Sequence, residues 1–353
     1  MKSRVRKAVQ DLDAYMPGEQ WREPGVIKLN TNENPYPPSP HVTTVLRDMI
    51  PVELTRYPDP NATRLRQALA RLHNGDLANV FVGNGSDEIL ALCTRAFVED
   101  DGVIAYFEPS YSLYQVLADM RNVKRGPIEL NADFGWPASE MAPGACKASL
   151  FLLAYPNAPT AMVYEPATIR EFCRTFEGVI VIDQAYVDFA TENCDVLALE
   201  FDNVLVVRTF SKSYSLAGIR IGYALGNSEL IEALFKLKDS YNTNSLSQEV
   251  ALAAVKDHQH MLKNVAVIRA TRERLAQALQ DRGFLVLPSH ANFIMAKPPS
   301  LSAEELYKRL RAMRILVRYF SGRRTAEYVR ITVGTNEQVA ALLKALDAIL
   351  RAG

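Results

Sequence analysis

The sequence has no excess of charge of either sign and contains few cysteines. Among 353 residues, 40 Lys and Arg balance 40 Asp and Glu, so the formal net charge is zero. This balance argues against a protein that binds nucleic acid through its overall charge, although a local basic site stays possible. Cys93, Cys146, Cys173 and Cys194 form no C-x-x-C pair and lie near no histidine at zinc-finger spacing. We therefore expect reduced thiols in a cytosolic protein, and no metal site.

Long apolar runs are also missing. The longest apolar stretches, such as Leu150–Tyr155, are far too short to span a bilayer. The basic residues 1–10 are followed by Asp-Leu-Asp-Ala-Tyr rather than by the apolar region of a signal peptide. These features predict a cytoplasmic protein without a membrane segment. With 48% apolar and 23% charged residues, the composition is that of a globular protein, and the length suggests roughly two domains.

Short apolar runs alternate with helical patterns from about residue 61 onward. The runs cover residues 80–82, 103–107, 150–154, 179–182 and 204–207. Each is bounded by Gly, Pro, Asn or charged residues, and helical segments separate several of them. This arrangement is typical of a mostly parallel sheet that helices cover on both faces. Asn61 is expected to cap the first of these helices.

The pattern changes in the last third of the chain. A long helical stretch runs from Ser245 to about Asp281 and ends at Gly283. Three later segments look like strands and two like helices: residues 291–296, 315–319 and 328–333, then 303–313 and 337–351. We predict an α/β fold with a large domain over residues 45–265. A smaller α+β domain is expected to combine residues 266–353 with the N-terminal arm, residues 1–44.

The residues that follow each apolar run are the candidates for a site, because ligands of open α/β sheets bind at the carboxyl ends of the strands. The first run leads into Gly83-Asn84-Gly85-Ser86-Asp87-Glu88. Its glycines permit a tight turn, and Ser86 suits a helix N-cap whose free N–H groups can bind phosphate. Glu88 breaks the G-x-G-x-x-G pattern of dinucleotide binding. This loop is therefore either a plain strand-to-helix connection or a site that binds phosphate.

Two further runs end in polar groups. Asn157 follows residues 150–154 between two prolines, where a simple turn is the plainer interpretation. Asp183 ends the strongly apolar run 179–182, and a carboxylate that is partly buried needs a partner. That partner is a salt bridge, a helix cap or a protonated heterocyclic nitrogen.

The most informative segment follows the run 204–207. Lys212 lies between Ser211 and Ser213, and Arg220 follows eight residues later between two glycines. Lysine is the side chain that forms Schiff bases when burial or a neighbouring charge makes its amine available. Hydroxyl and guanidinium groups bind phosphate. The spacing indicates a Schiff-base lysine beside a phosphate site rather than a surface lysine.

Together these motifs resemble the fold-type-I enzymes that use pyridoxal 5′-phosphate (PLP), and among them the aminotransferases of the histidinol-phosphate group. The resemblance covers nearly the full chain, in order. It implies that Lys212 carries the cofactor as a Schiff base, and that Asp183 pairs with the pyridinium nitrogen. Asn157 and Tyr186 are then expected to hydrogen-bond the ring oxygen O3′, and Tyr111 to stack on the ring. The residues implied for the cofactor phosphate are Gly85, Ser86, Asp87, Ser211, Ser213 and Arg220.

Two N-terminal segments make the resemblance more specific. Residues 29–36 read L-N-T-N-E-N-P-Y and residues 56–60 read R-Y-P-D-P, as in the histidinol-phosphate group. In that group the tyrosine that matches Tyr57 reaches the cofactor phosphate of the other subunit, so a homodimer is implied. By the same resemblance, Tyr15 and Asn32 help to enclose the substrate.

Two C-terminal segments look like the arginine strands of the same group. They are V-R-Y-F at residues 317–320 and V-R-I-T-V-G-T at residues 329–335. Arg318 and Arg330 are therefore expected to bind the anionic end of the substrate. Residues 311–330 hold six arginines and one acid, a local positive excess suited to a phosphate or a dicarboxylate. Within this stretch, we expect Arg311 and Arg314 to lie on a solvent-exposed surface rather than at the site.

Two segments depart from the pattern of the group, at three positions in all. P-N-N-P-T-G reads P-N-A-P-T-A at residues 156–161, and D-E-A-Y reads D-Q-A-Y at residues 183–186. The positions assigned to the cofactor survive these changes. The implied activity is a ping-pong transamination of histidine biosynthesis, between histidinol phosphate/imidazole acetol phosphate and glutamate/2-oxoglutarate.

Alternatives on the same scaffold are an aminotransferase for aromatic or other amino acids and a PLP decarboxylase of a phosphorylated amino acid. Intact Lys212 disfavours a non-catalytic PLP-binding regulatory module. The broken glycine motif disfavours a nicotinamide dehydrogenase.

Overall fold

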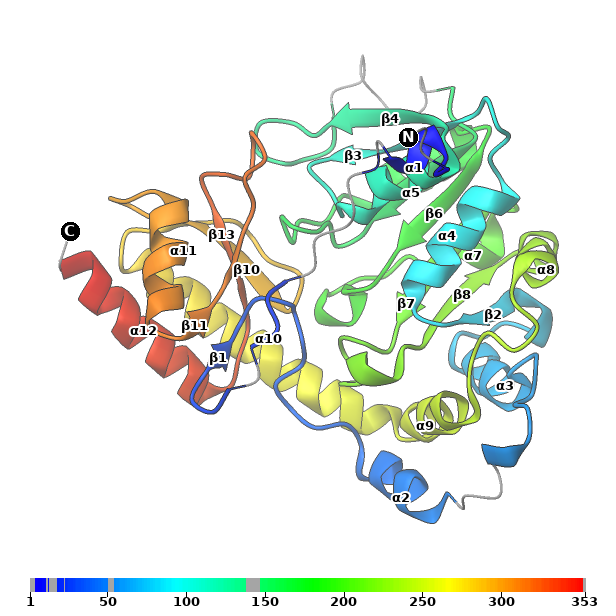
Figure 1. Cartoon of the computed structure of the whole chain (residues 1–353), viewed down its shortest axis with the longest axis horizontal. Helices are drawn as coiled ribbons and strands as arrows, with labels where there is room; N and C mark the ends of the chain where they lie inside the picture. The colour runs from blue at the N-terminus through cyan, green and yellow to red at the C-terminus, as the bar shows by residue number, and fades with distance from the viewer. Residues whose placement is uncertain are drawn as a thin grey trace.

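The computed structural model describes residues 4–10, 12, 18–21, 23–49, 54–137 and 147–351. Its largest element is a seven-stranded sheet in the order β2-β8-β7-β6-β5-β3-β4 (Figure 1). The strands are β2 (Val80–Gly83), β3 (Val103–Glu108), β4 (Lys124–Glu129), β5 (Leu150–Ala154), β6 (Val179–Asp183), β7 (Val204–Thr209) and β8 (Gly222–Gly226). Strands β3 to β7 pair in parallel, whereas β8 runs antiparallel to β2 and β7. The mostly parallel sheet expected from the sequence is confirmed.

Helices cover both faces of this sheet, which is why its strands read as continuous apolar runs. Successive residues of a strand point to opposite faces. In β5, Phe151 and Leu153 belong to one apolar core and Leu150 and Leu152 to the other. One face packs against α4 (Ser86–Ala96), α5 (Leu113–Arg121) and α8 (Ser228–Leu237). The opposite core takes residues from α2 (Pro40–Asp48), α3 (Thr63–Leu72), α6 (Pro166–Thr175), α7 (Leu197–Glu200) and α9 (Ser245–Lys256).

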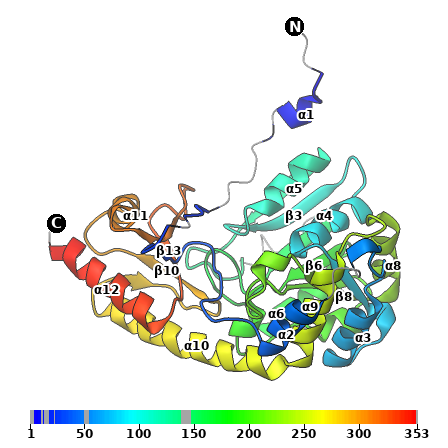
Figure 2. The ribbon, with the colours of Figure 1, turned by 60° about the horizontal axis from the view of Figure 1, so that its bottom comes forward.

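A second, smaller group of elements lies to one side of the large sheet (Figures 1 and 2). Its four strands follow the antiparallel order β12-β13-β10-β9. They are β9 (Leu285–Val286), β10 (Phe293–Lys297), β12 (Arg318–Tyr319) and β13 (Val329–Thr332), accompanied by α11 (Ala303–Ala312) and α12 (Asn336–Arg351). The N-terminal strand β1 (Ile27–Lys28) pairs with β11 (Ile315–Leu316). Leu29 shares a core with Ile315, so segments from both ends of the chain pack together.

One long helix links the two groups. Helix α10 (His258–Gln280) extends from α9 toward the side that holds α12 (Figure 2). It is continuous through residue 265, the expected domain boundary, so the division at residues 45 and 265 stays a prediction. A further short helix, α1 (Lys7–Gln10), lies near the N-terminus. Within the ranges described, no helix combines the length and the apolarity that a bilayer crossing requires.

Two local expectations were wrong. Asn61 does not cap α3: the Asp59 carboxylate accepts hydrogen bonds from the backbone N–H groups of Asn61, at 2.9 Å, and Thr63, at 2.7 Å. The stretch from Ser245 to Asp281 is also not one helix. Asp257 has non-helical dihedral angles between α9 and α10, and its carboxylate accepts a hydrogen bond from Ser39. At the start of α3 an aspartate side chain thus satisfies free backbone N–H groups, and between α9 and α10 an aspartate contacts a side chain outside the helix.

Gly222 of β8 offers a test of how tightly the sheet packs against the turn before α4. A Cβ atom at this position would lie 2.5 Å from the Ser86 backbone nitrogen and 2.9 Å from the Arg208 carbonyl oxygen. Backbone atoms cannot move aside cheaply, so we expect Gly222→Ala to lower the free energy of unfolding by about 1–3 kcal/mol in urea titrations. Gly218→Ala is the matched control, because a Cβ there meets nothing within 4 Å. Equal stability of the two variants would contradict this view of the packing.

Candidate active site

A cavity of about 610 Å³ lies at the carboxyl ends of the parallel strands, as the fold class predicts. Residues of the large sheet, the N-terminal arm and the small sheet line it together. Among the residues expected from the sequence, those at the cavity wall are Asn32, Ser86, Asp87, Tyr111, Asp183, Tyr186, Ser211, Lys212, Arg220, Arg318 and Arg330. The structure thus brings together side chains that lie up to three hundred residues apart in the sequence.

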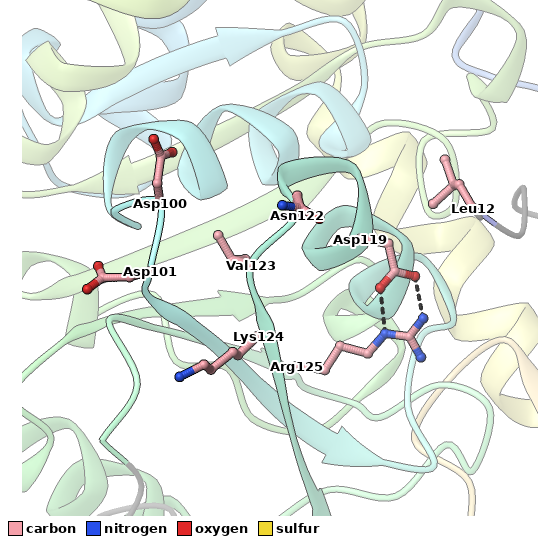
Figure 3. Close-up of a pocket in the computed structure, with 8 residues that line it drawn as sticks. All are labelled: Leu12, Asp100, Asp101, Asp119, Asn122, Val123, Lys124 and Arg125. Atoms are coloured by element: carbon pink, nitrogen blue, oxygen red, sulfur yellow. Dashed lines mark hydrogen bonds and ion pairs between the residues drawn. The ribbon is translucent and has the colours of Figure 1, made fainter. Parts of the chain in front are cut away.

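A second hollow, of about 390 Å³, lies at the other edge of the sheet (Figure 3). It gathers residues before β3 and at the start of β4, including Asp100 and Lys124. Arg125 there already forms an ion pair with Asp119, with the Nε–Oδ1 distance at 2.6 Å. This hollow lies at the amino ends of the parallel strands, opposite to the edge where ligands of such folds bind.

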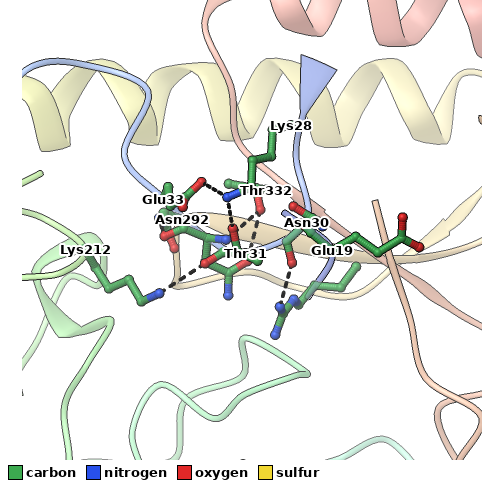
Figure 4. A network of polar contacts seen from close by, with 10 residues as sticks. Glu19, Lys28, Asn30, Thr31, Glu33, Lys212, Asn292 and Thr332 are labelled. Carbon is green, nitrogen blue, oxygen red and sulfur yellow. Dashed lines mark hydrogen bonds and ion pairs between the residues drawn. The ribbon is translucent and has the colours of Figure 1, made fainter. Parts of the chain in front are cut away.

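Lys212 presents its amine to the larger cavity from the loop after β7. Its Nζ donates a hydrogen bond to the Thr31 carbonyl oxygen at 3.1 Å (Figure 4). The same Nζ lies 5.6 Å from the centre of the Tyr186 ring. The Thr31 hydroxyl in turn accepts a hydrogen bond from Lys28 at 2.8 Å. The N-terminal arm therefore supplies the contact that holds the amine in place.

Asp183 ends β6 with its carboxylate buried. One carboxylate oxygen accepts a hydrogen bond from the Tyr114 hydroxyl at 2.9 Å, and the other from the Ala185 backbone N–H at 3.1 Å. Burial nevertheless raises the pKa of Asp183 to about 6, because neither hydrogen bond supplies the positive charge that a buried carboxylate needs. A cation placed beside this carboxylate would favour its ionised form.

Tyr186 and Asn32 join the two sheets at the cavity. The Asn32 amide donates to the Tyr186 hydroxyl at 3.0 Å, and its side-chain oxygen accepts from the Thr332 hydroxyl at 3.1 Å. Asn292 donates to the Asn32 carbonyl oxygen at 2.9 Å. Asn32 has a φ of 57°, a left-handed conformation that asparagine tolerates better than most residues. The arm thereby fixes the position of the phenol.

An anion cradle forms where α4 begins. Arg220 extends one Nη to within 3.3 Å of Asp87 and the other to 3.4 Å from the Ser211 hydroxyl. Gly85 has a φ of 81°, and a Cβ there would lie 2.6 Å from the Arg220 guanidinium. The free N–H groups at the start of α4, a guanidinium and two serine hydroxyls form a donor set suited to phosphate. Tyr111 lies beside this cradle, with its hydroxyl 3.4 Å from Asp87.

Some expected residues lie elsewhere. The Ser213 side chain is buried and donates to Asp188, and it is not among the residues that line the cavity; its expected phosphate contact stays a prediction. Asn157 is also buried behind the wall; its amide donates to the Pro109 carbonyl at 3.0 Å and to the Thr160 hydroxyl at 2.9 Å. Tyr15 lies outside the described residues.

Tyr57 lies on the surface and not at the cavity of this chain. Its side chain is 79% exposed and stacks on Tyr241, with the ring centres 4.3 Å apart. Its expected contact with a second subunit stays a prediction.

The two expected substrate arginines face each other across a strand pair. Arg318 of β12 is directly opposite Arg330 of β13, an unfavourable placement for two like charges. The Phe320 ring lies 5.4 Å from the Arg318 guanidinium and 5.2 Å from that of Arg330, within the range of cation–π attraction. Phe320 was missed from the sequence, although its spacing of two from Arg318 is the signal that both share a strand face. Arg311 is exposed, as expected, and forms an ion pair with Glu19.

Comparison with known proteins places the chain in a family. The family model Aminotransferase class I and II matches residues 24–346, and the chain belongs to this family. It is 41% identical over 351 residues to histidinol-phosphate aminotransferase 1 of Nostoc sp., with 99% of each chain covered.

Solved structures show the same fold. The histidinol-phosphate aminotransferase from Sinorhizobium meliloti, solved in complex with pyridoxal-5′-phosphate, superimposes with a TM-score of 0.90 at 24% identity, covering 100% of this chain and 99% of that one. The L-threonine-O-3-phosphate decarboxylase from Porphyromonas gingivalis reaches a TM-score of 0.80 at 24% identity, covering 92% and 100%. At such identities the likeness establishes the fold alone. The fold-type-I architecture expected from the sequence is confirmed.

The raised pKa of Asp183 predicts that the free energy of unfolding of the ligand-free chain falls as the pH rises. A carboxyl whose pKa rises from 3.8 to about 6 on folding contributes stability below pH 3.8 that is lost as the pH passes 6. Asp183→Asn should therefore raise the free energy of unfolding at pH 8 by roughly 1–3 kcal/mol, and by much less at pH 4, in urea titrations. Glu99→Gln, at an exposed carboxylate, is the control. A gain that is equal at both pH values would show that the charge of Asp183 is not its cause.

Proposed function

We propose that this chain is a PLP-dependent aminotransferase that exchanges an amino group between histidinol phosphate/imidazole acetol phosphate and glutamate/2-oxoglutarate. The observation that carries the proposal is the convergence of Lys212, Asp183 and the Arg318–Arg330 pair on one cavity. The family membership and the Nostoc relative support it. The step belongs to histidine biosynthesis.

The residues at the cavity fit PLP. The cofactor needs a lysine amine, an anion for its ring nitrogen and a phosphate site. Lys212 offers the amine, and the buried Asp183 carboxylate lacks the cation that a protonated ring nitrogen would supply. Ser86, Ser211 and Arg220 would hold the phosphate at the start of α4.

The remaining contacts to the ring are proposals of the same kind. Tyr111 and Tyr186 line the cavity and are available to stack on the ring and to hydrogen-bond O3′. Asn157 would have to exchange one of its two amide hydrogen bonds to reach that oxygen.

Bound PLP supplies an electron sink that stabilises a carbanion at the substrate α-carbon. Lys212 is the tethered amine that takes the proton from that α-carbon and returns a proton in the next step. Its contact with Thr31 keeps the amine directed into the cavity. Asp183 would stay ionised beside the protonated ring nitrogen. The hydrogen bond from Asn32 holds the Tyr186 hydroxyl in place at the cavity.

The arginine pair favours a doubly charged substrate. Two guanidinium groups on opposed residues suit a phosphate monoester and a dicarboxylate, which a ping-pong enzyme of this kind must both accept. An aminotransferase for aromatic amino acids needs only one such arginine. A decarboxylase of a phosphorylated amino acid shares the fold, and the orientation of the scissile bond separates the two reactions.

A homodimer is part of the proposal. The stacked pair Tyr57 and Tyr241 lies on the surface, and nearby Leu54 is 64% exposed. Exposed apolar and aromatic side chains of this kind mark interfaces. The partner chain would cover them, with Tyr57 reaching its cofactor phosphate. A cytoplasmic location remains the expectation from the sequence.

The cofactor assignment has a spectroscopic test. Protein reconstituted with PLP should absorb in the visible region, and borohydride should fix the cofactor on Lys212. Lys212→Ala should lose both the fixed adduct and turnover, because no other amine replaces it. Lys236→Ala, at an exposed lysine paired with Glu232, is the control and should keep both. A wild-type chain that stays colourless after reconstitution would end the proposal.

The substrate assignment is tested by single-turnover half-reactions with histidinol phosphate, phenylalanine, tyrosine and threonine phosphate. We expect histidinol phosphate to convert the cofactor faster than phenylalanine or tyrosine, because it offers a phosphate dianion to Arg318 and Arg330; threonine phosphate offers the same dianion and tests whether the rest of the substrate is recognised. If phenylalanine converts the cofactor faster, histidinol phosphate is not the preferred substrate.

Arg318 should matter most for phosphorylated donors. Arg318→Gln removes a charged hydrogen-bond donor, and we expect kcat/KM for histidinol phosphate to fall roughly 10–100-fold. Arg311→Gln, at an exposed arginine, should change it little. An equal loss with phosphorylated and unphosphorylated donors would remove the phosphate role of Arg318.

A further inference from the structure

A buried group of charged residues lies next to the Lys212 loop and takes no part in the site described above. Arg208 of β7 donates one Nη to Asp195 at 2.7 Å and the other to Asp188. His73 Nδ1 lies 2.9 Å from the same Asp195 oxygen. The four side chains are only 7–17% exposed. We call these residues the Arg208 cluster.

The cluster is joined to the residue directly after Lys212. The Ser213 hydroxyl, 2% exposed as a residue, donates to Asp188. The next side chain is also tied down, because the Tyr214 hydroxyl lies 2.8 Å from His258 Nδ1 at the start of α10. The loop that carries the reactive amine is thus held on its C-terminal side by buried polar contacts.

Asp188 belongs to the segment that carries the other reactive groups. It follows Tyr186 by two residues, in the 3₁₀ turn Val187–Phe189. Asp183 and Tyr186 precede it on the same short stretch after β6. A hydrogen bond from Ser213 to Asp188 therefore connects the lysine loop to the loop of the carboxylate and the phenol.

Stability alone does not account for such a cluster. Burying several charges costs desolvation free energy, and apolar residues of similar size stabilise a core at least as well. What an arginine fork adds is direction: it fixes two carboxylates in one geometry. Here the fork fixes Asp188, the acceptor that Ser213 contacts.

We propose that Ser213 and Asp188, oriented by Arg208, are positioning residues for Lys212. They hold the lysine loop in register with the segment of Asp183 and Tyr186, so that the amine reaches the atom from which it takes a proton. Ser213 therefore serves the reaction through Asp188 rather than by contacting a phosphate. This inference rests on the proposed function only in taking Lys212 as the reactive amine.

The test compares Ser213→Ala and Asp188→Asn with Thr94→Val. Thr94 is a matched control: its hydroxyl is equally buried, donates to a backbone carbonyl at 2.8 Å and lies in α4, outside the Arg208 cluster. In the PLP-loaded enzyme, both test variants should lower kcat roughly three- to tenfold with KM within twofold, whereas Thr94→Val should change neither.

A second measurement needs no turnover. In the cofactor-free full-length chain, the rate of reductive methylation of Lys212, followed by mass spectrometry, reports on the placement of its amine. We expect Ser213→Ala to change this rate at least threefold relative to the exposed Lys236 in the same sample, and Thr94→Val to leave it unchanged. Urea titrations of all variants separate these effects from loss of stability.

The outcomes are decisive for the inference. If Ser213→Ala only shifts the urea midpoint, as Thr94→Val does, and leaves kcat and methylation within twofold, the Arg208 cluster is structural and the proposal fails. If Asp188→Asn does not fold, Ser213→Ala decides alone. If the wild type binds no PLP, the proposed function fails, while the methylation comparison still decides whether Ser213 positions Lys212.

Discussion

The burial of the large sheet on both faces is the constraint from which the site follows. Strands β5, β7 and β8 are buried at every residue, so they carry few polar side chains and the chemistry is displaced to their ends. The parallel strands β5, β6 and β7 end at one edge, and Asp183 and Lys212 meet there. The same burial that makes the sheet stable keeps water from the Asp183 carboxylate and raises its pKa. Packing and reactivity thus have one cause.

The N-terminal arm completes what the sheet begins. It has little regular structure, yet Thr31 holds the Lys212 amine, and Asn32 contacts both Tyr186 and Thr332. Asn30 accepts a hydrogen bond from Arg330 through its carbonyl at 3.1 Å. A segment without its own secondary structure leaves backbone groups unpaired, and here these groups bind side chains of both sheets. The arm therefore sets the distance between the reactive amine and the substrate arginines.

Local pattern was sufficient to predict five of the seven strands of the large sheet, because each is a run of apolar residues. Strands β4 and β8 were missed, since β4 is largely exposed and carries charged residues, and β8 is a short run between two glycines. Local pattern also placed Asp183, Lys212 and the turn at Gly85 at or after strand ends, where the structure has them. The direction of a side chain such as Ser213 could not be predicted, since it depends on Asp188, which is near only in the folded chain. Tyr114 was also missed, because a tyrosine on an apolar helix face reads as core until its hydroxyl is seen to reach Asp183. The choice of Asp59 rather than Asn61 as the acceptor at the start of α3 also depends on side-chain direction, even though both residues are close in the sequence.

The zero net charge of the chain conceals a separation of charge within its cavity. Arg318 and Arg330 lie opposite each other, each within about 5.5 Å of the Phe320 ring, and two like charges so placed favour binding of a dianion. Asp183, at the end of β6, is buried and forms no direct ion pair with a described residue, and burial raises its pKa in spite of the Lys212 charge, at a cost that a protonated heterocycle would offset. The two groups call for ligands of opposite charge. A cavity that holds both is built for a substrate anion and a cationic ring at the same time, which is the requirement of transamination and not of simple anion binding.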